Sequence, residues 1–225
     1  DLPTIMETMQ ALKVELVAVT MPFKEKILTY LHESTDAVKA LQAANTLICR
    51  DGKWSGYNTD VDGIAYALRA VVLSNKNLLL LGAGGAARAA GYFFQQHAVN
   101  LFWLNRTTDK AKQLAKLFGG KVLTEETVQD AEIDIVINTT PIGLFPDVDV
   151  TPLVGYTFQP QQVVFDMVYN PMQTLLLQQA QATGARIISG MEMFIGQGLR
   201  QIELWQGRAL QRIVSSLLKE VLLNK

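Results

Sequence analysis

Cysteine and histidine, which supply most zinc ligands and many catalytic groups, are scarce in this chain. Its 225 residues include one cysteine, Cys49, and two histidines, His32 and His97. One cysteine excludes an intramolecular disulfide and fits a reducing cytoplasm. Zinc sites need several Cys or His ligands, so we expect no metal. His32 is expected in a polar turn and His97 at the far end of a helix, and both are interpreted as surface residues.

Charge of one sign and long apolar runs are lacking as well. Lys and Arg number 20 and Asp and Glu number 21, so the formal net charge is -1. This balance gives no reason to expect a nucleic-acid or membrane-surface partner. The most apolar region, 78–94, is interrupted by glycines and by Arg88, so we expect no transmembrane span. Residues 1–10 lack the basic and apolar regions of a signal peptide. Together these absences favour a cytoplasmic protein with a small-molecule partner.

What the chain does have is an alternation of strand-like and helix-like segments, with 49% apolar residues available for a core. A buried parallel strand is expected at 14–21, followed by a helix from Pro22. A hairpin around Asp51-Gly52 is expected within 45–60, and a helix at 61–72.

From residue 77 the alternation is regular. Strands are expected at 77–84, 100–106, 133–141, 162–170 and 185–190. Helices are expected at 85–96, 109–118, 172–184 and over most of 193–223. Strands that alternate with helices predict a parallel sheet with helices on both faces. The expected fold class is α/β, with a doubly wound parallel sheet from about residue 61 onward.

A glycine-rich turn follows the strand at 77–84. Gly82, Gly84 and Ala87 have the G-x-G-x-x-A spacing of dinucleotide-binding turns. Gly82 would allow the tight turn, Gly84 would let the backbone approach a pyrophosphate, and Ala87 would let the helix pack against the sheet. The free N–H groups at the start of that helix would face the anion. A glycine turn without a ligand is the alternative, and the strand-turn-helix-strand context favours a dinucleotide site.

The end of the next strand indicates which dinucleotide binds. NAD-specific sites place Asp or Glu there, where the carboxylate bonds the ribose hydroxyls and repels a 2′-phosphate. This chain has Asn105, Arg106 and Thr107, with Lys110 close behind. A guanidinium, a hydroxyl and an ammonium together suit a phosphate, so the sequence predicts NADP(H). The alternative is a solvated basic turn in which Thr107 or Thr108 caps the following helix.

Reduction of a ketone by a nicotinamide needs a group that gives the developing alkoxide a proton. No tyrosine precedes a lysine by four residues, and metal and histidine sites are disfavoured above, so lysine remains. Lys24 follows an apolar strand, near where ligand crevices of α/β sheets open, and Asp60 begins a helix. A lysine beside a carboxylate can stay protonated and exchange a proton with substrate. The alternatives are a surface lysine and a helix cap, since Thr59-x-x-Asp62 matches a capping box.

Eight motifs in a fixed order resemble the shikimate dehydrogenase family. They are "VTMPFKEKI", "AANTL", "GYNTDVDGI", "LLLGAGGAARAA", "LNRTTDKA", "INTTPIGL", "FDMVYNP" and "GMEMFIGQGLRQIELW". V-T-x-P-F-K, Asn-Thr-Asp followed by Gly63, and the late Met-x-x-x-Gln are specific to that family. The resemblance runs along essentially the whole chain. It implies NADPH-dependent reduction of 3-dehydroshikimate to shikimate, a step of chorismate and aromatic amino acid biosynthesis.

The resemblance also implies roles for particular residues. Lys24 and Asp60 would form the catalytic pair, with Lys24 as the proton donor. The substrate hydroxyls would be bound by Thr20, Asn45, Asp60 and Gln197, with Tyr169 nearby. The adenosine phosphates of the cofactor would contact Gly82, Gly84, Gly85, Ala86, Asn105, Arg106, Thr107 and Lys110. The nicotinamide end would lie beside Thr139, Met167, Gly190 and Met193.

A two-domain architecture is implied by the same resemblance. Residues 1–60 and 190–225 would form a smaller α/β substrate domain, and residues 61–189 a Rossmann-like NADP-binding domain. The protein would work as a monomer or a homodimer.

Two features depart from the family pattern. Ala18 stands where the family usually has an Asn that binds substrate. The family's opening βαβ unit, whose Ser-x-Ser turn receives the substrate carboxylate, is not found in these residues. We expect that unit to be disordered, removed, or supplied by a longer polypeptide such as a fusion to 3-dehydroquinate dehydratase. The departures leave three alternatives: a quinate/shikimate dehydrogenase that uses NAD(P), a catalytically impaired nucleotide-binding paralogue, and a partner-binding remnant.

Overall fold

The computed structural model describes residues 1–20 and 22–210. Contacts within the chain divide it into two compact units. The first unit is Asp1–Asp62 together with the chain from Gln197 onward, and the second unit is Gly63–Gly196. The sequence placed these boundaries near residues 61 and 190, and the functions expected of the two parts stay predictions.

A four-stranded sheet forms the first unit, in the order β1-β3-β4-β2. The predicted hairpin is confirmed: β3 (Thr46–Arg50) pairs antiparallel with β4 (Lys53–Tyr57). Asp51 and Gly52 form its turn with φ of 49° and 74°, the left-handed conformation that such two-residue turns require. β2 (Glu33–Ser34) pairs parallel with β4.

Two predictions for the first unit are wrong. The run at 14–21 contains only the three-residue β1 (Leu16–Ala18), which lies at the sheet edge and pairs antiparallel with β3. An apolar β-branched run favours a strand but does not specify the direction of its neighbour. The helix expected from Pro22 is the 3-10 helix η1 (Lys26–Tyr30). Such short connectors commonly adopt i to i+3 hydrogen bonds, as Leu28 N to Glu25 O does here.

Two helices of the first unit were not predicted from sequence. α1 (Leu2–Ala11) starts at Asp1, whose carboxylate accepts a hydrogen bond from Thr4 N at 3.1 Å, a regular N-cap. α2 (Asp36–Leu41) is capped in the same way by Thr35. Both helices are short, and they bury only a few side chains in a small core. This core contains Met6, Ile27, Val38, Ala44, Leu47 and Trp54.

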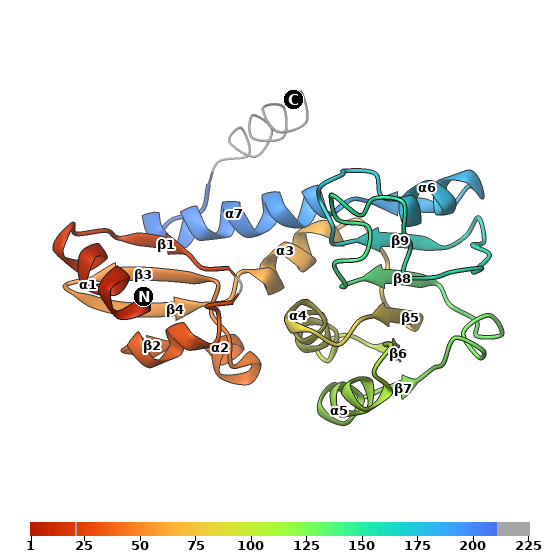
Figure 1. Cartoon of the computed structure of the whole chain (residues 1–225), viewed down its shortest axis with the longest axis horizontal. Helices are drawn as coiled ribbons and strands as arrows, with labels where there is room; N and C mark the ends of the chain where they lie inside the picture. The colour runs from red at the N-terminus through yellow and green to blue at the C-terminus, as the bar shows by residue number, and fades with distance from the viewer. Residues whose placement is uncertain (21, 211–225) are drawn as a thin grey trace. The chain divides into compact units, whose positions relative to one another are not determined.

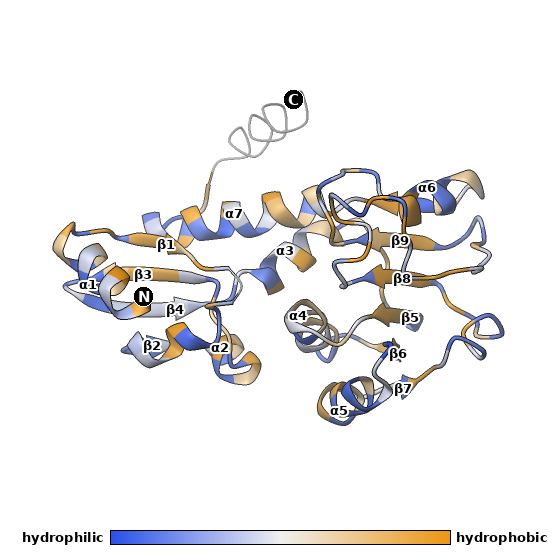
Figure 2. Cartoon of the chain, in the orientation of Figure 1, coloured by the Kyte–Doolittle hydropathy of each residue, from blue (hydrophilic) through white to orange (hydrophobic). Residues whose placement is uncertain are grey.

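The second unit has a six-stranded sheet, all parallel, in the order β10-β9-β8-β5-β6-β7 (Figure 1). Its strands are β5 (Lys76–Leu81), β6 (Val99–Leu104), β7 (Lys121–Val122), β8 (Ile135–Asn138), β9 (Val163–Asp166) and β10 (Arg186–Ile188). This arrangement confirms the predicted doubly wound α/β fold. Leu78, Leu79 and Leu80 are fully buried, because helices cover both faces of a parallel sheet. Figure 2 shows the strands β5, β8 and β9 as mostly apolar.

Helices connect these strands as predicted. They are α4 (Gly85–Phe94), α5 (Thr108–Phe118) and α6 (Leu175–Ala182), with α3 (Asp60–Ala67) before the sheet and α7 (Gly190–Gln206) after it. Right-handed crossovers place α4 and α5 on one face and α6 on the other. The direction of winding therefore reverses between β5 and β8, and ligands of such sheets bind at this point, beyond the carboxyl ends of the strands. The last helix was predicted over most of 193–223, but α7 ends at Gln206, where Gly207 has φ of 67°. Residues 211–223 of that prediction lie outside the described residues.

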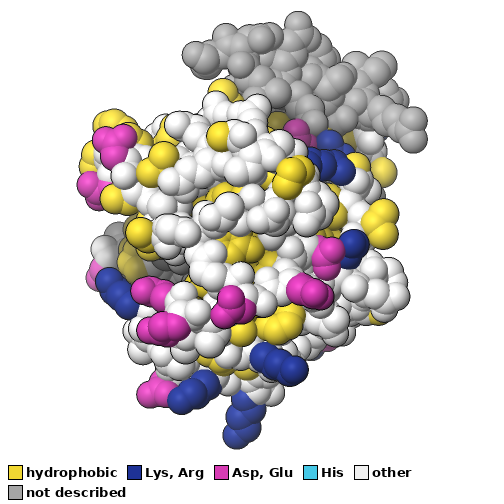
Figure 3. All heavy atoms as spheres, turned by 90° about the vertical axis from the view of Figure 1, so that its right-hand side faces the viewer, with side chains coloured by type: hydrophobic (Ala, Val, Ile, Leu, Met, Phe, Trp, Pro, Cys, Tyr) yellow, Lys and Arg dark blue, Asp and Glu magenta, His cyan; other side chains and the backbone are white. Residues whose placement is uncertain are grey.

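The described face of the second unit in Figure 3 carries Lys and Arg side chains interspersed with Asp and Glu. No broad field of one sign covers that view. A protein that binds nucleic acid through phosphates usually presents a basic face, and this face is mixed. Over residues 1–20 and 22–210, no helix is long and apolar enough to cross a bilayer.

Candidate active site and cofactor site

Lys24 and Asp60 form an ion pair in the first unit. Lys24 Nζ lies 2.7 Å from Asp60 Oδ2, and the two side chains are 28% and 15% exposed. Lys24 comes from the turn that leads into η1, and its carbonyl accepts a hydrogen bond from Ala44 N at 2.9 Å. Asp60 is the first residue of α3. The turn before η1 and the start of α3 thus place an ammonium and a carboxylate together, partly shielded from water.

The side chain of Asn45 holds this pair in place. Its Nδ2 donates to Asp60 Oδ1 at 2.9 Å and to Gln197 Oε1 at 3.3 Å. Its Oδ1 accepts from Thr59 N at 2.7 Å and from Thr46 Oγ1 at 2.8 Å. Asn45 is only 2% exposed, so its four partners fix the amide orientation. Asp60 therefore has one oxygen on Lys24 and the other on Asn45.

The helix-cap alternative for this segment finds no support in these contacts. The Thr59 hydroxyl lies 3.1 Å from Asn45 Nδ2 and 3.2 Å from Thr46 Oγ1. Asp62, its expected capping-box partner, instead pairs with Arg200 Nε at 3.4 Å. Burial raises the pKa of the Asp62 carboxyl, and Arg200 partly opposes that shift. Thr46 and Thr59 were not predicted as site residues, although the sequence places each beside a polar motif residue.

The remaining predicted substrate residues are in different settings. Thr20 is exposed, and its carbonyl accepts from Phe23 N at 2.9 Å in the turn before Lys24. Gln197 lies on α7, where its Oε1 also accepts from Gln201 Nε2 at 3.3 Å. Tyr169 belongs to the second unit, where its ring stacks on Phe194 with centroids 5.0 Å apart. The structure thus brings Lys24, Asp60, Asn45 and Gln197 into one hydrogen-bonded group.

This group can do proton-transfer chemistry. A lysine ammonium has three N–H donors, and one of them is held by Asp60. The others can contact a carbonyl oxygen and donate a proton as charge develops on it. Across residues 1–20 and 22–210, no group of three or more Asp, Glu, His or Cys side chains is placed to hold a metal ion.

The glycine turn of the second unit has the geometry that a dinucleotide requires. Gly82 has φ of 108°, and a Cβ there would lie 2.7 Å from Thr139 Oγ1, so this position is closed to larger residues. Gly84 and Gly85 would meet nothing within 4 Å. They open α4, where the first N–H groups of a helix have no partner within the helix. The open space beside Gly84 and Gly85 and the N–H groups at the start of the helix together suit a pyrophosphate.

The turn after β6 presents unpaired cations. Arg106 and Lys110 are exposed, and neither pairs with a carboxylate within the described part of the chain. Asn105 Nδ2 donates to Thr107 O at 2.8 Å and shapes the turn. Thr107 occupies the N-cap position of α5 without a side-chain capping bond, so its hydroxyl is available to a ligand. These groups fit a 2′-phosphate.

The residues expected at the nicotinamide end follow the carboxyl ends of neighbouring strands. Thr139 comes directly after β8, and its hydroxyl donates to Leu81 O at 2.6 Å. Met167 comes directly after β9, and its N–H donates to Asn138 O at 3.0 Å. A Cβ at Gly190 would lie 2.5 Å from Met167 O, so α7 starts against this loop. Met193 lies three residues further along α7.

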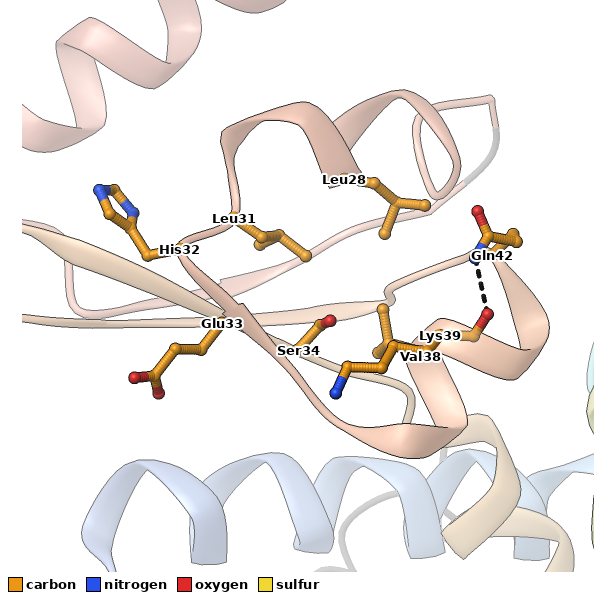
Figure 4. A pocket seen from close by; sticks show the side chains of 8 residues that line it. All are labelled: Leu28, Leu31, His32, Glu33, Ser34, Val38, Lys39 and Gln42. Carbon is orange, nitrogen blue, oxygen red and sulfur yellow. Dashed lines mark hydrogen bonds between the residues drawn. The ribbon is translucent and has the colours of Figure 1, made fainter.

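A separate cavity of about 580 Å³ lies in the first unit between η1, β2 and α2 (Figure 4). Leu28 and Val38 line one side of it, and His32 and Glu33 point away from them. Gln42 Nε2 donates to Lys39 O at 2.6 Å at the end of α2. None of the predicted catalytic or substrate residues lines this cavity, so it is distinct from the Lys24–Asp60 group.

Models of known protein families match residues in both units of the chain. Residues 1–47 match the family model of the shikimate dehydrogenase substrate binding domain, and residues 65–143 match that of shikimate/quinate 5-dehydrogenase. The NADP(+) shikimate dehydrogenase of Shouchella clausii is 38% identical over 221 residues, which are 94% of this chain and 80% of that protein.

Solved structures of two dehydrogenases are similar to this chain in fold and in sequence. Shikimate 5-dehydrogenase from Thermus thermophilus, solved with NADP(H) and shikimate, superposes with a TM-score of 0.85 at 30% identity, over 93% of this chain and 79% of that one. Quinate dehydrogenase from Corynebacterium glutamicum, solved with NAD, has a TM-score of 0.87 at 28% identity, over 100% of this chain and 83% of that one.

Proposed function

This chain belongs to the shikimate dehydrogenase family, and we propose that Lys24 and Asp60 carry out the proton transfer of its reaction. The reaction is the NADPH-dependent reduction of 3-dehydroshikimate to shikimate, on the route to chorismate and the aromatic amino acids. The single observation that supports the residue assignment is the 2.7 Å pairing of Lys24 Nζ with Asp60 Oδ2, partly buried and fixed by Asn45.

The chemistry balances with one hydride and one proton. Bound NADPH supplies the hydride that forms the new C–H bond at the ring carbonyl carbon. The Lys24 ammonium donates its proton to the carbonyl oxygen, which becomes the hydroxyl of shikimate. Asp60 accepts a hydrogen bond from Lys24 and orients its ammonium group for the transfer. One proton taken up from solution then restores the Lys24 ammonium.

The substrate hydroxyls are proposed to contact the same group. Asn45 and Gln197 present amide groups beside Asp60, and Thr20 precedes the Lys24 turn. Tyr169, in the second unit, is proposed to meet the substrate through its exposed hydroxyl edge. A polyhydroxylated ring needs several such donors and acceptors to fix one carbonyl beside one ammonium.

NADP(H) is the cofactor of the family, and the residues of the second unit are proposed to hold it as follows. Gly84, Gly85 and the following Ala86 offer backbone N–H groups to the pyrophosphate. Arg106, with Asn105, Thr107 and Lys110, takes the 2′-phosphate. Thr139, Met167, Gly190 and Met193 surround the nicotinamide, next to Gly82. We also propose that the enzyme acts in the cytoplasm, as a monomer or homodimer, on a small molecule alone.

The test is a matched pair of lysine variants. Lys24→Ala should reduce turnover of NADPH with 3-dehydroshikimate by about 100-fold or more, because proton transfer by a positioned group typically contributes that much. NADPH affinity, measured by fluorescence titration, should stay within about twofold. Lys26→Ala removes an exposed lysine from the same segment and should leave both quantities unchanged. Wild-type turnover in Lys24→Ala would refute the assignment.

A second candidate activity, that of a quinate dehydrogenase, is supported by the similarity to a quinate dehydrogenase. Ala18, which replaces the usual substrate-binding Asn of the family, favours the impaired paralogue instead. The same assay should therefore compare 3-dehydroquinate with 3-dehydroshikimate, and NADH with NADPH. The unpaired Arg106 and Lys110 favour NADPH over NADH. A kcat/KM higher for 3-dehydroquinate than for 3-dehydroshikimate would select the quinate activity, and inactivity with both would select the impaired paralogue.

A further inference from the structure

Asp166 is a fully buried carboxylate that the proton-transfer chemistry does not use. It ends β9 and is 0% exposed. Its Oδ1 accepts from Asn138 Nδ2 at 2.9 Å and from Val168 N at 3.0 Å, and its Oδ2 accepts from Thr174 Oγ1 at 2.6 Å. These donors come from the end of β8, the loop after β9 and the start of α6. One side chain thus connects three separate segments.

The residues bound by Asp166 in turn shape the loops beside the winding reversal of the sheet. Asn138 Oδ1 accepts from Thr140 N at 2.9 Å and from Thr140 Oγ1 at 2.7 Å, which fixes the loop after β8. Asn138 O accepts from Met167 N at 3.0 Å. Thr139 and Met167 are therefore each held by a neighbour that is itself held by Asp166. Thr174, the N-cap of α6, fixes the far end of the loop after β9.

We propose that Asp166 is a positioning residue for hydride transfer: it locks the loops after β8 and β9 so that Thr139 and Met167 hold the nicotinamide in place. This inference rests on the proposed function, because it takes the nicotinamide to lie beside those two residues. Every donor that faces Asp166 is neutral: an amide, a hydroxyl and a backbone N–H. No cation pairs with Asp166 in the described part of the chain.

The surroundings of Asp166 argue against a purely stabilising role. Burial raises its pKa to about 6, and the hydrogen bonds from Thr174, Val168 and Asn138 oppose the shift only in part. A buried carboxylate without a cation is an unfavourable choice for stability alone. Its three fixed acceptor contacts do give geometric specificity, because they allow one arrangement of the loops.

The experiment compares Asp166→Ala and Asp166→Asn in the full chain, with Asp134→Ala as the matched control. Asp134 precedes β8 at the opposite edge of the same sheet, where it bonds Lys76 Nζ at 2.7 Å and Asn77 N at 2.9 Å. In Asp166→Asn, the amide oxygen can still accept from Asn138 and Val168. Its NH2 can donate to the Thr174 hydroxyl, which rotates to accept. Asp166→Asn should therefore keep the kcat that Asp166→Ala loses.

Two measurements distinguish a positioning role of Asp166 from a general disruption of the fold. One is kcat for NADPH oxidation, and the other is the affinity for adenosine 2′,5′-bisphosphate, which lacks the nicotinamide. We expect Asp166→Ala to lower kcat by about tenfold or more, since small misplacements of reacting groups reduce rates strongly. Its affinity for the bisphosphate should stay within about twofold. Asp166→Asn and Asp134→Ala should both resemble the wild type.

Thr174→Val, paired with Thr174→Ser, provides the same test if Asp166→Ala does not fold. Valine removes the hydroxyl that bonds Asp166, and serine keeps it. Wild-type kcat in folded Asp166→Ala or Thr174→Val overturns the proposal. An equal loss of kcat and bisphosphate affinity also overturns the proposal, and so does unfolding of both variants. Either result would mean that Asp166 has a structural role only. If the wild type itself turns over no dehydroshikimate, the proposed function fails. The ratio of NADPH to bisphosphate affinity in Asp166→Ala then still tests positioning, and a selective loss of NADPH affinity supports it.

Discussion

Asn45 Nδ2 lies 2.9 Å from Asp60 Oδ1, on the side of the carboxylate opposite Lys24. This contact fixes which oxygen of Asp60 meets the lysine. It also shows how a partly exposed ion pair gains a defined geometry, because Asn45 itself is buried and bonded at both ends of its amide. Substitutions at Asn45 should therefore change the position of the Lys24 ammonium indirectly, through Asp60.

Asn45→Ala is expected to weaken both fold and catalysis. The substitution leaves Thr59 N without its buried acceptor and frees Asp60 to rotate, so the free energy of unfolding should fall by about 1–3 kcal/mol. kcat/KM for 3-dehydroshikimate should fall by about tenfold or more. Urea unfolding and steady-state kinetics measure the two effects. Asn100→Ala, at an exposed residue whose side chain donates to Asn77, is the control. An unchanged kcat/KM in Asn45→Ala would show that Asp60 does not need this support.

Arg106→Ala is expected to reduce the preference for NADPH over NADH by about tenfold or more, since a charged hydrogen bond to phosphate contributes about 1.5–3 kcal/mol. KM for NADPH should rise and KM for NADH should stay constant, because only the first carries the 2′-phosphate. The rise should shrink at high salt, which screens exposed charges. Lys112→Ala removes a nearby exposed cation that is already paired with Asp109 at 3.4 Å, and it should change neither KM. Equal changes for both cofactors would place the phosphate elsewhere.

Gly82 and Gly84 should respond differently to alanine. Gly82 has φ of 108° and no room for a Cβ, so Gly82→Ala should lower the free energy of unfolding by about 2 kcal/mol or more. Gly84 has φ of -92° and open space around it. Gly84→Ala should therefore leave the melting temperature unchanged and weaken NADPH binding by about tenfold, because its methyl group occupies the path of the pyrophosphate. Thermal melts and fluorescence titrations of both variants test this contrast, and a Gly84→Ala protein with full NADPH affinity would contradict it.

Local patterns explain what the sequence could predict. Three features depend on residues close together in the chain: the glycine turn, the unpaired cations after β6 and the strand-helix alternation. The sequence could therefore predict them without knowledge of the fold. β1 and η1 were mispredicted because a short apolar run and a proline carry no information about strand direction or helix type.

Contacts between distant parts of the chain could not be predicted from the sequence. Thr46 and Thr59 look like ordinary strand and cap residues. Thr46 follows Asn45 in the sequence, and the β3–β4 hairpin brings the Thr59 hydroxyl to the same amide. Asp166 is the last residue of a buried apolar strand, and nothing local predicts that Asn138 and Thr174 will face it. The Lys24–Asp60 pair was reached from sequence through elimination and family resemblance, since its two members are separated by the whole β2–β4 region.

Asp166 should also make stability depend on pH in an unusual direction. Burial raises its pKa to about 6 in the folded protein, against an ordinary value of 3.8 for an aspartate carboxyl. Between these values the folded state binds the proton more readily than the unfolded chain, so stability contributed by this group increases as the pH falls and is lost as the pH rises through about 6. Lowering the pH from about 7 to about 5 should therefore stabilise the wild type by roughly 1 kcal/mol relative to Asp166→Asn. Urea unfolding of both proteins at the two pH values measures this difference. Every other titratable group is shared by the pair, so their effects cancel when the two proteins are compared. A difference that does not change with pH would mean that Asp166 keeps an ordinary pKa in the folded protein.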